Sequence, residues 1–372
     1  MAFLSDILSR ITLAALATTV AVALFLPLAY RYRLLDIPKG RKDHNSPTPV
    51  IGGLAMITGF LATAALFGGI ENQPLLAFSV SSIILIVLGQ LDDKYDLPWY
   101  FRICVQIIAT LIIAIWGEIR VDHVGALFGE GDIHLGIWSL PLTIFAVVGL
   151  INAINMVDGV DGLAGSLALT AMFMLASAAL YAGNQTLTLH IVTLCGAVIG
   201  FLYFNFRTPW RKRAAIFMGN GGSTFLGFSI AWAALQVTQT PAHPVSPILA
   251  LWLIPIPLID CLALIIHRTR KGHSPFKADH NHIHHLMRDI GCPPSHTTLL
   301  ISLFSLILGL GAAISLRSGV QEATLFLGFI FFALLWCWLT AKRERALTFL
   351  RIISSGGKRI SRSSTEVSLR RE

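Results

Sequence analysis

Long apolar stretches alternate with short polar segments along this chain. Eleven of the stretches hold roughly 17–25 residues with few charges, the length of an α-helix that crosses a bilayer. They lie at residues 11–29, 51–70, 75–91, 101–117, 137–153, 163–182, 187–205, 221–238, 246–266, 297–316 and 322–340. The pattern predicts an all-α polytopic membrane protein with about eleven transmembrane helices. We expect a single transmembrane domain over residues 1–341, followed by a basic tail over residues 342–372.

The composition agrees with this pattern. Of the 372 residues, 55% are hydrophobic and only 13% are charged, and the mean hydropathy is +0.70. A soluble domain of this size needs far more polar surface, so the composition excludes a soluble globular protein. The first apolar stretch has no small-residue cleavage site after it and is followed by basic residues. We therefore expect a retained helix and not a signal peptide.

Lys and Arg are concentrated in every second loop. Of these 28 basic residues, 25 lie in segments 30–49, 92–102, 207–213 and 268–288 or in the tail from residue 342. The positive-inside rule places these segments in the cytoplasm and the N-terminus on the opposite side of the membrane. We expect a multi-pass membrane protein. Its partners would include membrane lipids and no nucleic acid, because topology and anionic headgroups alone explain much of the net charge of +8.

Five polar motifs fall in the loops that this topology places in the cytoplasm. The first contains Asp36, Lys42 and His44, the second Asp92, Asp93 and Asp96, the third Asn155, Asp158 and Asp161, the fourth Phe217 and Asn220, and the fifth His282, His284 and His285. A transporter would place its polar site near the bilayer midplane. Motifs gathered at one membrane face instead favour an enzyme with one substrate from the cytosol and a second substrate in the bilayer.

The acidic residues of the second motif point to a divalent cation. Asp92, Asp93 and Asp96 repel one another at a membrane surface unless a cation or a proton intervenes. Mg²⁺, with Mn²⁺ as an alternative, takes oxygen ligands and commonly bridges protein carboxylates to substrate phosphates. A pair of aspartates at a helix end is also an ordinary structural feature, so this motif alone leaves both interpretations open.

The glycine-rich and histidine-rich motifs also have alternative interpretations. Glycines 219, 221 and 222 would let backbone N–H groups approach a phosphate, although the same turn could simply connect two helices. The histidines of segment 280–285 could hold zinc, but they lack a Cys or carboxylate at helical spacing. We therefore favour phosphate contact or proton transfer. Asp260 lies inside an apolar stretch, and we expect it to cap a proline-broken helix rather than line a transport path.

In this order on an eleven-span chain, the motifs resemble a known superfamily. The chain reads Asp-Asp-x-x-Asp from Asp92, Asn-Ala-x-Asn-x-x-Asp-Gly-x-Asp-Gly-Leu from Asn152, Phe-Met-Gly-x-x-Gly-Ser from Phe217 and His-Ile-His-His from His282. This set is similar to the polyprenyl-phosphate N-acetylhexosamine-1-phosphate transferases, glycosyltransferase family 4, and within them to the WecA-type undecaprenyl-phosphate GlcNAc-1-phosphate transferases. The resemblance covers residues 36–285. Asp96 and the His-Ile-His-His form set the chain apart from the phospho-MurNAc-pentapeptide transferases.

The resemblance implies a reaction. The phosphate of undecaprenyl phosphate would attack the diphosphate of UDP-GlcNAc, or of another UDP-N-acetyl sugar, and UMP would leave. The product would be a lipid-linked sugar diphosphate, the first lipid-linked step of a cell-surface polysaccharide such as O-antigen or common antigen. Positioning and charge neutralisation by Mg²⁺ and basic residues would lower the barrier. Residues 1–341 would then be a catalytic domain with cytoplasmic active-site loops. The resemblance also implies a multi-pass protein of the bacterial inner membrane, with a periplasmic N-terminus and a cytoplasmic C-terminus.

The resemblance also implies roles for individual residues. Asp92 and Asp93 would lie beside the lipid phosphate, Phe217 would stack on uracil, and the third motif would hold the nucleotide. The catalytic candidates are Asp92, Asp93, Asp158, Asp161 and His282. The substrate-binding candidates are Asp36, Lys42, His44, Asp96, Asn155, Phe217, Arg268, His284 and His285. The metal-ligand candidates are Asp92, Asp93 and Asn220.

One residue departs from the family pattern. Asn220 stands where the family normally has an aspartate that is its principal Mg²⁺ ligand. An amide oxygen can coordinate a hard cation but carries no negative charge, so the affinity for Mg²⁺ should fall. Either Asp92, Asp93 and the substrate diphosphate hold the ion, or the protein is an inactive homologue, or it has an altered, regulatory role. The sequence is also compatible with a homodimer.

Overall fold

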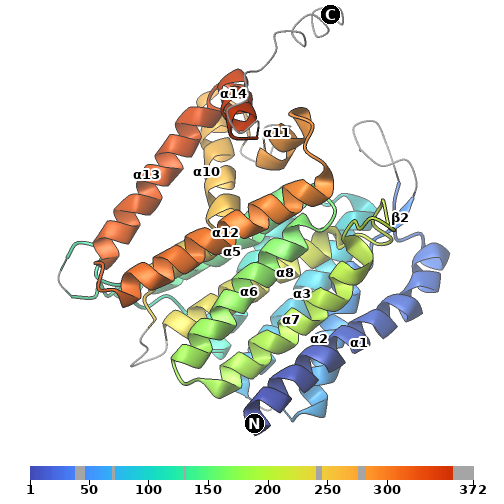
Figure 1. Cartoon of the computed structure of the whole chain (residues 1–372). Helices are drawn as coiled ribbons and strands as arrows, with labels where there is room; N and C mark the ends of the chain where they lie inside the picture. The colour runs from blue at the N-terminus through green and yellow to red at the C-terminus, as the bar shows by residue number, and fades with distance from the viewer. Residues whose placement is uncertain (38–46, 69–71, 130, 240–244, 275–281, 355–372) are drawn as a thin grey trace, which may run out of the picture.

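The computed structural model describes residues 1–37, 47–68, 72–129, 131–239, 245–274 and 282–354 (Figure 1). Helices make up most of this part of the chain. They are α1 (Ala2–Tyr32), α2 (Gly52–Leu66), α3 (Gln73–Tyr95), α4 (Trp99–Leu111), the π-helical turn η2 (Ile112–Trp116), the 3₁₀ turn η3 (Gly136–Trp138), α5 (Ser139–Val157), α6 (Leu163–Tyr181), α7 (Gln185–Asn205), α8 (Gly219–Thr238), α9 (Ile248–Leu253), α10 (Pro255–Arg270), α11 (Ile283–Asp289), α12 (Pro294–Arg317), α13 (Glu322–Thr340) and α14 (Arg343–Ser354). The expected all-α class is confirmed.

Helix α8 lies in the interior of the bundle. It packs against α2, α3, α5 and α6, and most of its side chains are buried, including those of Phe225, Phe228 and Trp232. Because its neighbours are helices and not lipid, α8 can carry Gly, Ser and Thr residues that let backbones come close. A Cβ atom at Gly89 of α3 would collide with the backbone of Gly221, which shows how closely α3 and α8 approach.

Eight helical segments in the described part of the chain are long and apolar enough to cross a membrane. They correspond to eight of the eleven expected stretches. The other three are α2, which has only 15 residues, the interior helix α8, and the pair α9–α10. Pro255 begins α10 directly after the break between those two helices. The two helices do not form one continuous helix, because proline lacks the backbone N–H that would donate the next helical hydrogen bond.

The outer helices expose large apolar side chains. Leu24 on α1, Leu303 on α12, and Phe331 and Leu334 on α13 are each more than half exposed. Soluble proteins rarely leave such extensive apolar surface in water, so these faces suit a lipid environment. The structure thus supports a multi-pass membrane protein.

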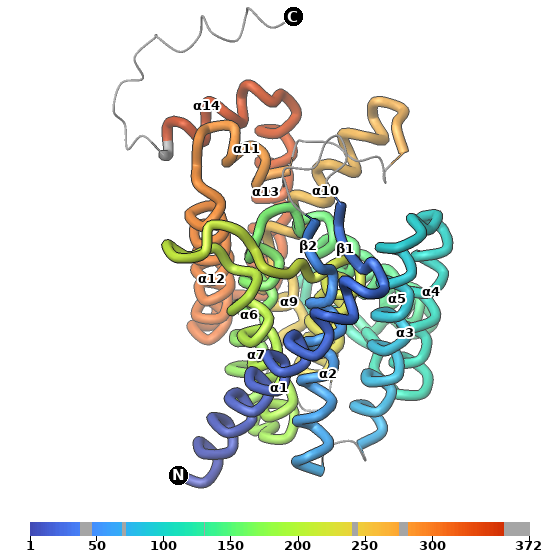
Figure 2. Tube along the Cα trace, turned by 90° about the vertical axis from the view of Figure 1, so that its right-hand side faces the viewer, coloured from blue at the N-terminus to red at the C-terminus, as the bar shows by residue number. Residues whose placement is uncertain are grey.

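The N-terminus and helices α11 and α14 lie at opposite ends of the molecule (Figures 1 and 2). After α1, strands β1 (Leu35–Asp36) and β2 (Thr48–Pro49) form a small antiparallel pair in which Asp36 lies opposite Thr48. Val50 then forms a parallel bridge with Phe217. This bridge ties the first polar segment to the turn that begins α8.

The segment after Lys342 is more structured than the sequence suggested. The sequence predicts a basic tail there, but residues 343–354 form α14, which packs on α11 and α13. Arg343 pairs with Asp289 of α11, the guanidinium of Arg345 lies 4.1 Å from the ring centre of Trp338, and Ala346 is buried. These tertiary contacts hold a helix whose apolar positions are too few to stand out in the sequence.

Candidate active site

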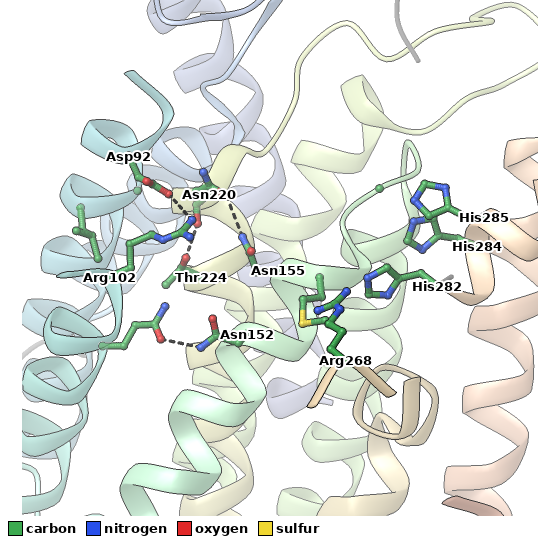
Figure 3. A pocket seen from close by; sticks show the side chains of 15 residues that line it. Asp92, Arg102, Asn152, Asn155, Asn220, Thr224, Arg268, His282, His284 and His285 are labelled. Carbon is green, nitrogen blue, oxygen red and sulfur yellow. Dashed lines mark hydrogen bonds and ion pairs between the residues drawn. The ribbon is translucent and has the colours of Figure 1, made fainter. Parts of the chain in front are cut away.

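A cavity of about 280 Å³ brings four of the five polar motifs or their neighbours together (Figure 3). Its walls come from the end of α3, the first half of α4, the end of α5, the start of α8, the end of α10 and the segment that begins α11. The lining residues that bear on chemistry are Asp92, Arg102, Gln106, Asn152, Asn155, Asn220, Arg268, His282, His284 and His285. The cavity therefore gathers acidic, amide, guanidinium and imidazole groups from segments far apart in sequence.

Asp92 forms the acidic wall of the cavity and is buried, with 3% of its surface exposed. Its Oδ1 accepts a hydrogen bond from the backbone N–H of Leu97 at 2.9 Å, and its Oδ2 lies 3.0 Å from Nη1 of Arg102. Arg102 is not among the residues that the motifs predict for the site, although it stands at the start of an apolar stretch just after the acidic motif. The pair places a carboxylate and a guanidinium on the same wall.

Asp93 and Asn220 join the end of α3 to the start of α8. The backbone N–H of Asn220 lies 3.1 Å from each carboxylate oxygen of Asp93. Gly219 allows this contact because it has a φ of +70°, and a side chain there would collide with Val50 and Asp93. The amide of Asn155 donates to Oδ1 of Asn220 at 3.0 Å and to Oγ of Ser223 at 2.8 Å. The turn is therefore fixed by groups from two other motifs.

The oxygen donors near this turn fit a hard divalent cation. Asp92 and Asn220 line the cavity, and Asp93 is hydrogen-bonded to the backbone of Asn220. Mg²⁺ is usually bound by one or two carboxylates together with substrate phosphates. The described residues include no cluster of three His, Cys, Asp or Glu side chains suited to a metal. A cation here would therefore depend on the two aspartates, the Asn220 amide and a substrate.

Asp158 and Asp161 follow α5 and differ in their surroundings. Asp158 as a whole residue is exposed, but its carboxyl group lies among protein atoms. This desolvation, and then the negative charges of Asp161 and Asp93, raise the pKa of Asp158 to about 7. Asp161 instead accepts hydrogen bonds from Nε of Arg207 at 2.6 Å and from the backbone N–H of Ala214 at 3.2 Å. Asp161 thus holds the segment before α8, and neither carboxylate is among the residues that line the cavity.

The basic wall of the cavity comes from Arg268 and three histidines. Arg268, His282 and His284 are all buried. The rings of His282 and His284 lie nearly parallel with centres 5.4 Å apart, and those of His284 and His285 are 4.3 Å apart. All four side chains line the cavity, and their contact with phosphates or with the N-acetyl sugar stays a prediction.

The structure corrects our interpretation of Asp260. We expected it to cap the proline-broken helix, but its described partners are Nδ1 of His282 at 3.0 Å, the backbone N–H of Ile283 at 3.3 Å and Nε1 of Trp336 at 3.2 Å. All three belong to other segments of the chain. Asp260 therefore connects α10 to the histidine motif and to α13.

Three other candidates, Asp36, Asp96 and Phe217, are not among the residues that line the cavity. Asp36 is in β1, Asp96 is an exposed residue that ends α3 with a φ of +51°, and Phe217 is half-buried beside Val50. Lys42 and His44 lie outside the described residues. Their roles in substrate binding stay predictions.

A second feature that the sequence analysis did not assign is an amide pair below the acidic wall. Nδ2 of Asn152 donates to Oε1 of Gln106 at 2.8 Å, and both side chains line the cavity. The single signal in the sequence is the presence of two amides in otherwise apolar stretches. The two residues are 46 positions apart in the sequence, so no local pattern indicates that they are in contact.

Comparison with known proteins supports the assignment from motifs. A family model for glycosyl transferase family 4 matches residues 75–238. The undecaprenyl-phosphate alpha-N-acetylglucosaminyl 1-phosphate transferase of Haemophilus influenzae is 33% identical over 91% of this chain and 95% of its own length. Proteins with the same name from Pasteurella multocida and Escherichia coli O157:H7 are 32% and 31% identical, each over 90% of this chain and over 93% and 91% of their own lengths. The chain therefore belongs to glycosyl transferase family 4.

Proposed function

We propose that this protein transfers GlcNAc 1-phosphate from UDP-GlcNAc to undecaprenyl phosphate, giving GlcNAc-diphospho-undecaprenol and UMP. The names of its relatives and the motif set support this reaction. The observation that carries the proposal is the single cavity in which Asp92, Arg102, Asn220, Arg268 and His282 meet. Such a cavity at one end of a membrane bundle suits a soluble nucleotide and a lipid phosphate.

The proposed reaction forms one P–O bond and breaks another. An oxygen of the lipid phosphate attacks the β-phosphorus of UDP-GlcNAc, and the bond from that phosphorus to the oxygen it shares with the α-phosphate breaks. Arg102 and Arg268 stand on opposite sides of the cavity (Figure 3). Guanidinium groups bind phosphate oxygens well, so these residues would hold the two substrates in line and stabilise the developing charge.

Asp92, Asp93 and Asn220 would hold Mg²⁺ or Mn²⁺. The bound ion would neutralise phosphate charge in the transition state. The pairing of Asp92 with Arg102 keeps this carboxylate in place, and the contact between Asp93 and the Asn220 backbone fixes the position of the turn. The metal requirement is part of the proposal and is tested by chelation.

The lipid substrate would enter past the start of α4. Trp99, Tyr100 and Phe101 are exposed there, next to Arg102 in the chain. Trp and Tyr side chains are enriched where a protein meets the membrane–water interface. A polyprenyl phosphate at this level would present its headgroup to Arg102 and Asp92 while its tail stays in the bilayer.

The nucleotide would bind in the part of the cavity next to the third motif. Asn155 lines the cavity, and Asp158 follows at the end of α5. Phe217 lies near the same turn and would stack on uracil. His282, His284 and His285, together with Arg268, would contact the diphosphate or the N-acetyl sugar.

The topology is part of the same proposal. We place the N-terminus in the periplasm and the C-terminus in the cytoplasm of a bacterial inner membrane, with eleven crossings and the site facing the cytoplasm. The basic loops and the opposite positions of the N-terminus and α11 support this orientation (Figure 2). The product would feed a cell-surface polysaccharide such as O-antigen or common antigen.

A panel of UDP-sugars tests the substrate assignment. Purified protein in detergent with undecaprenyl phosphate and Mg²⁺ should release UMP from UDP-GlcNAc, and UDP-GalNAc and UDP-glucose serve as comparison substrates. Faster release from UDP-GalNAc would change the sugar but keep the reaction class. An absence of UMP from every sugar, with protein that still unfolds cooperatively, would favour the inactive homologue that Asn220 suggests.

A further inference from the structure

Three hydrogen-bond donors converge on the buried carboxylate of Asp260. Its Oδ2 accepts from Nδ1 of His282 at 3.0 Å and from the backbone N–H of Ile283 at 3.3 Å. Its Oδ1 accepts from Nε1 of Trp336 at 3.2 Å. Only 1% of Asp260 is exposed, and His282 is buried as well. A carboxylate in such surroundings is tolerated because both oxygens have partners.

The contact fixes which nitrogen of His282 is available to a ligand. Because a carboxylate only accepts, Nδ1 of His282 must be the donor, whether the ring is neutral or protonated. Nε2 is then the nitrogen left for the cavity that His282 lines. A partner on one ring nitrogen sets the tautomer and the orientation of the ring.

We propose that Asp260, supported by Trp336, is a positioning residue that holds His282 with Nε2 directed at the phosphates of the UDP-sugar. This inference rests on the proposed function, which supplies those phosphates. Trp336 lies on α13, so the arrangement gives this outer helix a part in the site. The role of α13 then extends beyond facing lipid.

The geometry requires a carboxylate at position 260. His282 and Ile283 donate to one oxygen and Trp336 donates to the other, so the side chain must accept on both sides. Asparagine has a single acceptor oxygen, and its NH₂ group would face another donor. If the oxygen turns to His282, the NH₂ group meets the indole N–H of Trp336. Removing that N–H with Trp336→Phe would remove the conflict.

The test is a set of variants analysed for kcat and KM of UMP release. Asp260→Asn should lower kcat roughly tenfold to hundredfold, because misplacement of a group at the reacting centre is costly. The double variant D260N/W336F should recover part of this loss. In a His282→Ala background, Asp260→Asn should have almost no further effect on kcat, since residues that act through one another are not additive.

Trp336→Phe serves as a second route if Asp260→Asn does not fold. It should lower kcat by roughly twofold to tenfold, the value of one lost hydrogen bond, and should have no effect in the His282→Ala background. The midpoint of thermal unfolding of each variant controls for folding.

Two results would overturn the inference while the proposed function stands. The first is an equal loss from Asp260→Asn in the wild-type and His282→Ala backgrounds, which would show that Asp260 acts without His282. The second, a double variant D260N/W336F as slow as D260N, would remove the part assigned to Trp336. A wild-type protein that releases no UMP would instead overturn the proposed function and this inference together.

Discussion

The side-chain amide of Asn155 donates a hydrogen bond of 3.0 Å to the side-chain oxygen of Asn220, which lies 65 residues further along the chain. This contact bears on how strongly Asn220, which replaces the family's aspartate, can bind Mg²⁺. A carbonyl oxygen has two lone pairs, so the bond from Asn155 leaves one for a cation. A carboxylate at position 220 would accept the same bond, so an aspartate fits this turn without rearrangement.

Asn220→Asp should therefore lower the Mg²⁺ concentration that gives half-maximal UMP release. The change in half-maximal concentration should exceed the change in the saturated rate, because the amide already supplies an oxygen and lacks only the charge. The measurement is a Mg²⁺ titration of wild type and variant side by side. If both are active with the same Mg²⁺ dependence, the ion is held elsewhere. Activity in the variant alone would identify the natural protein as a disabled transferase.

The two neighbouring aspartates should respond differently to neutralisation. The sequence places both carboxylates at a membrane surface, but in the structure Asp92 is buried and paired with Arg102, whereas Asp93 is exposed. Asp92→Asn should slow turnover by orders of magnitude and also destabilise the protein, because it leaves Arg102 without its charge partner. Asp93→Asn should slow turnover with little change in unfolding.

Activity and the midpoint of thermal unfolding, measured on the same preparations, separate these effects. Asp6→Asn is the control, since this carboxylate is exposed, lies outside the cavity wall and has no proposed part in binding or catalysis. Near-normal rates in both the Asp92 and Asp93 variants would show that the pair is structural.

The ionisation of Asp158 should appear in the pH dependence of stability. Its pKa rises from 3.8 to about 7 in the folded protein, because desolvation of the carboxyl group and the charges of Asp161 and Asp93 disfavour the charged form. Solvent around this exposed residue screens part of the effect, so the slope should be shallow. Between about pH 4 and about pH 7 the folded protein keeps a proton that the unfolded chain has lost. Stability should therefore fall as pH rises through this window and become level above it.

Asp158→Asn should remove this part of the slope. The measurement is the unfolding midpoint of metal-free protein across the window, with Asp96→Asn as the exposed control. An identical slope in wild type and the Asp158 variant would mean that another group carries the dependence.

Truncations should divide the C-terminal segment into two parts. Removing residues 355–372 should leave UMP release unchanged. Removing residues 343–372 should lower the unfolding midpoint, because α14 contacts α11 through Arg343 and α13 through Arg345. Equal unfolding midpoints for the two truncations would show that α14 adds no stability.

The sequence predicted the class of the fold because bilayer spans leave a strong local signal. Helices α3, α6 and α7 lie within a few residues of the expected stretches. Helix α8 does not qualify as a span by apolarity, because it is surrounded by protein and can carry Gly, Ser and Thr. Only its position in the bundle explains its composition.

The candidate site could be predicted as a set of residue types but not as a set of contacts. The motifs identified Asp92, Asn155, Asn220 and the histidines, all of which the structure brings to one cavity. The partners of these residues escaped notice. Arg102 was counted only among the basic residues that set the topology. Trp336 was not singled out, because a hydrogen bond across 76 residues leaves no periodic signal.

The position of an isotope in the products tests the central claim most directly. The protein should be supplied with undecaprenyl phosphate, Mg²⁺ and UDP-GlcNAc labelled with ³²P in the β-phosphate. Transfer of the sugar together with its phosphate predicts label in the lipid product and unlabelled UMP in solution, in equal amounts. Labelled UDP in solution with an unlabelled lipid-linked sugar would mean transfer of the sugar alone, and would contradict the account.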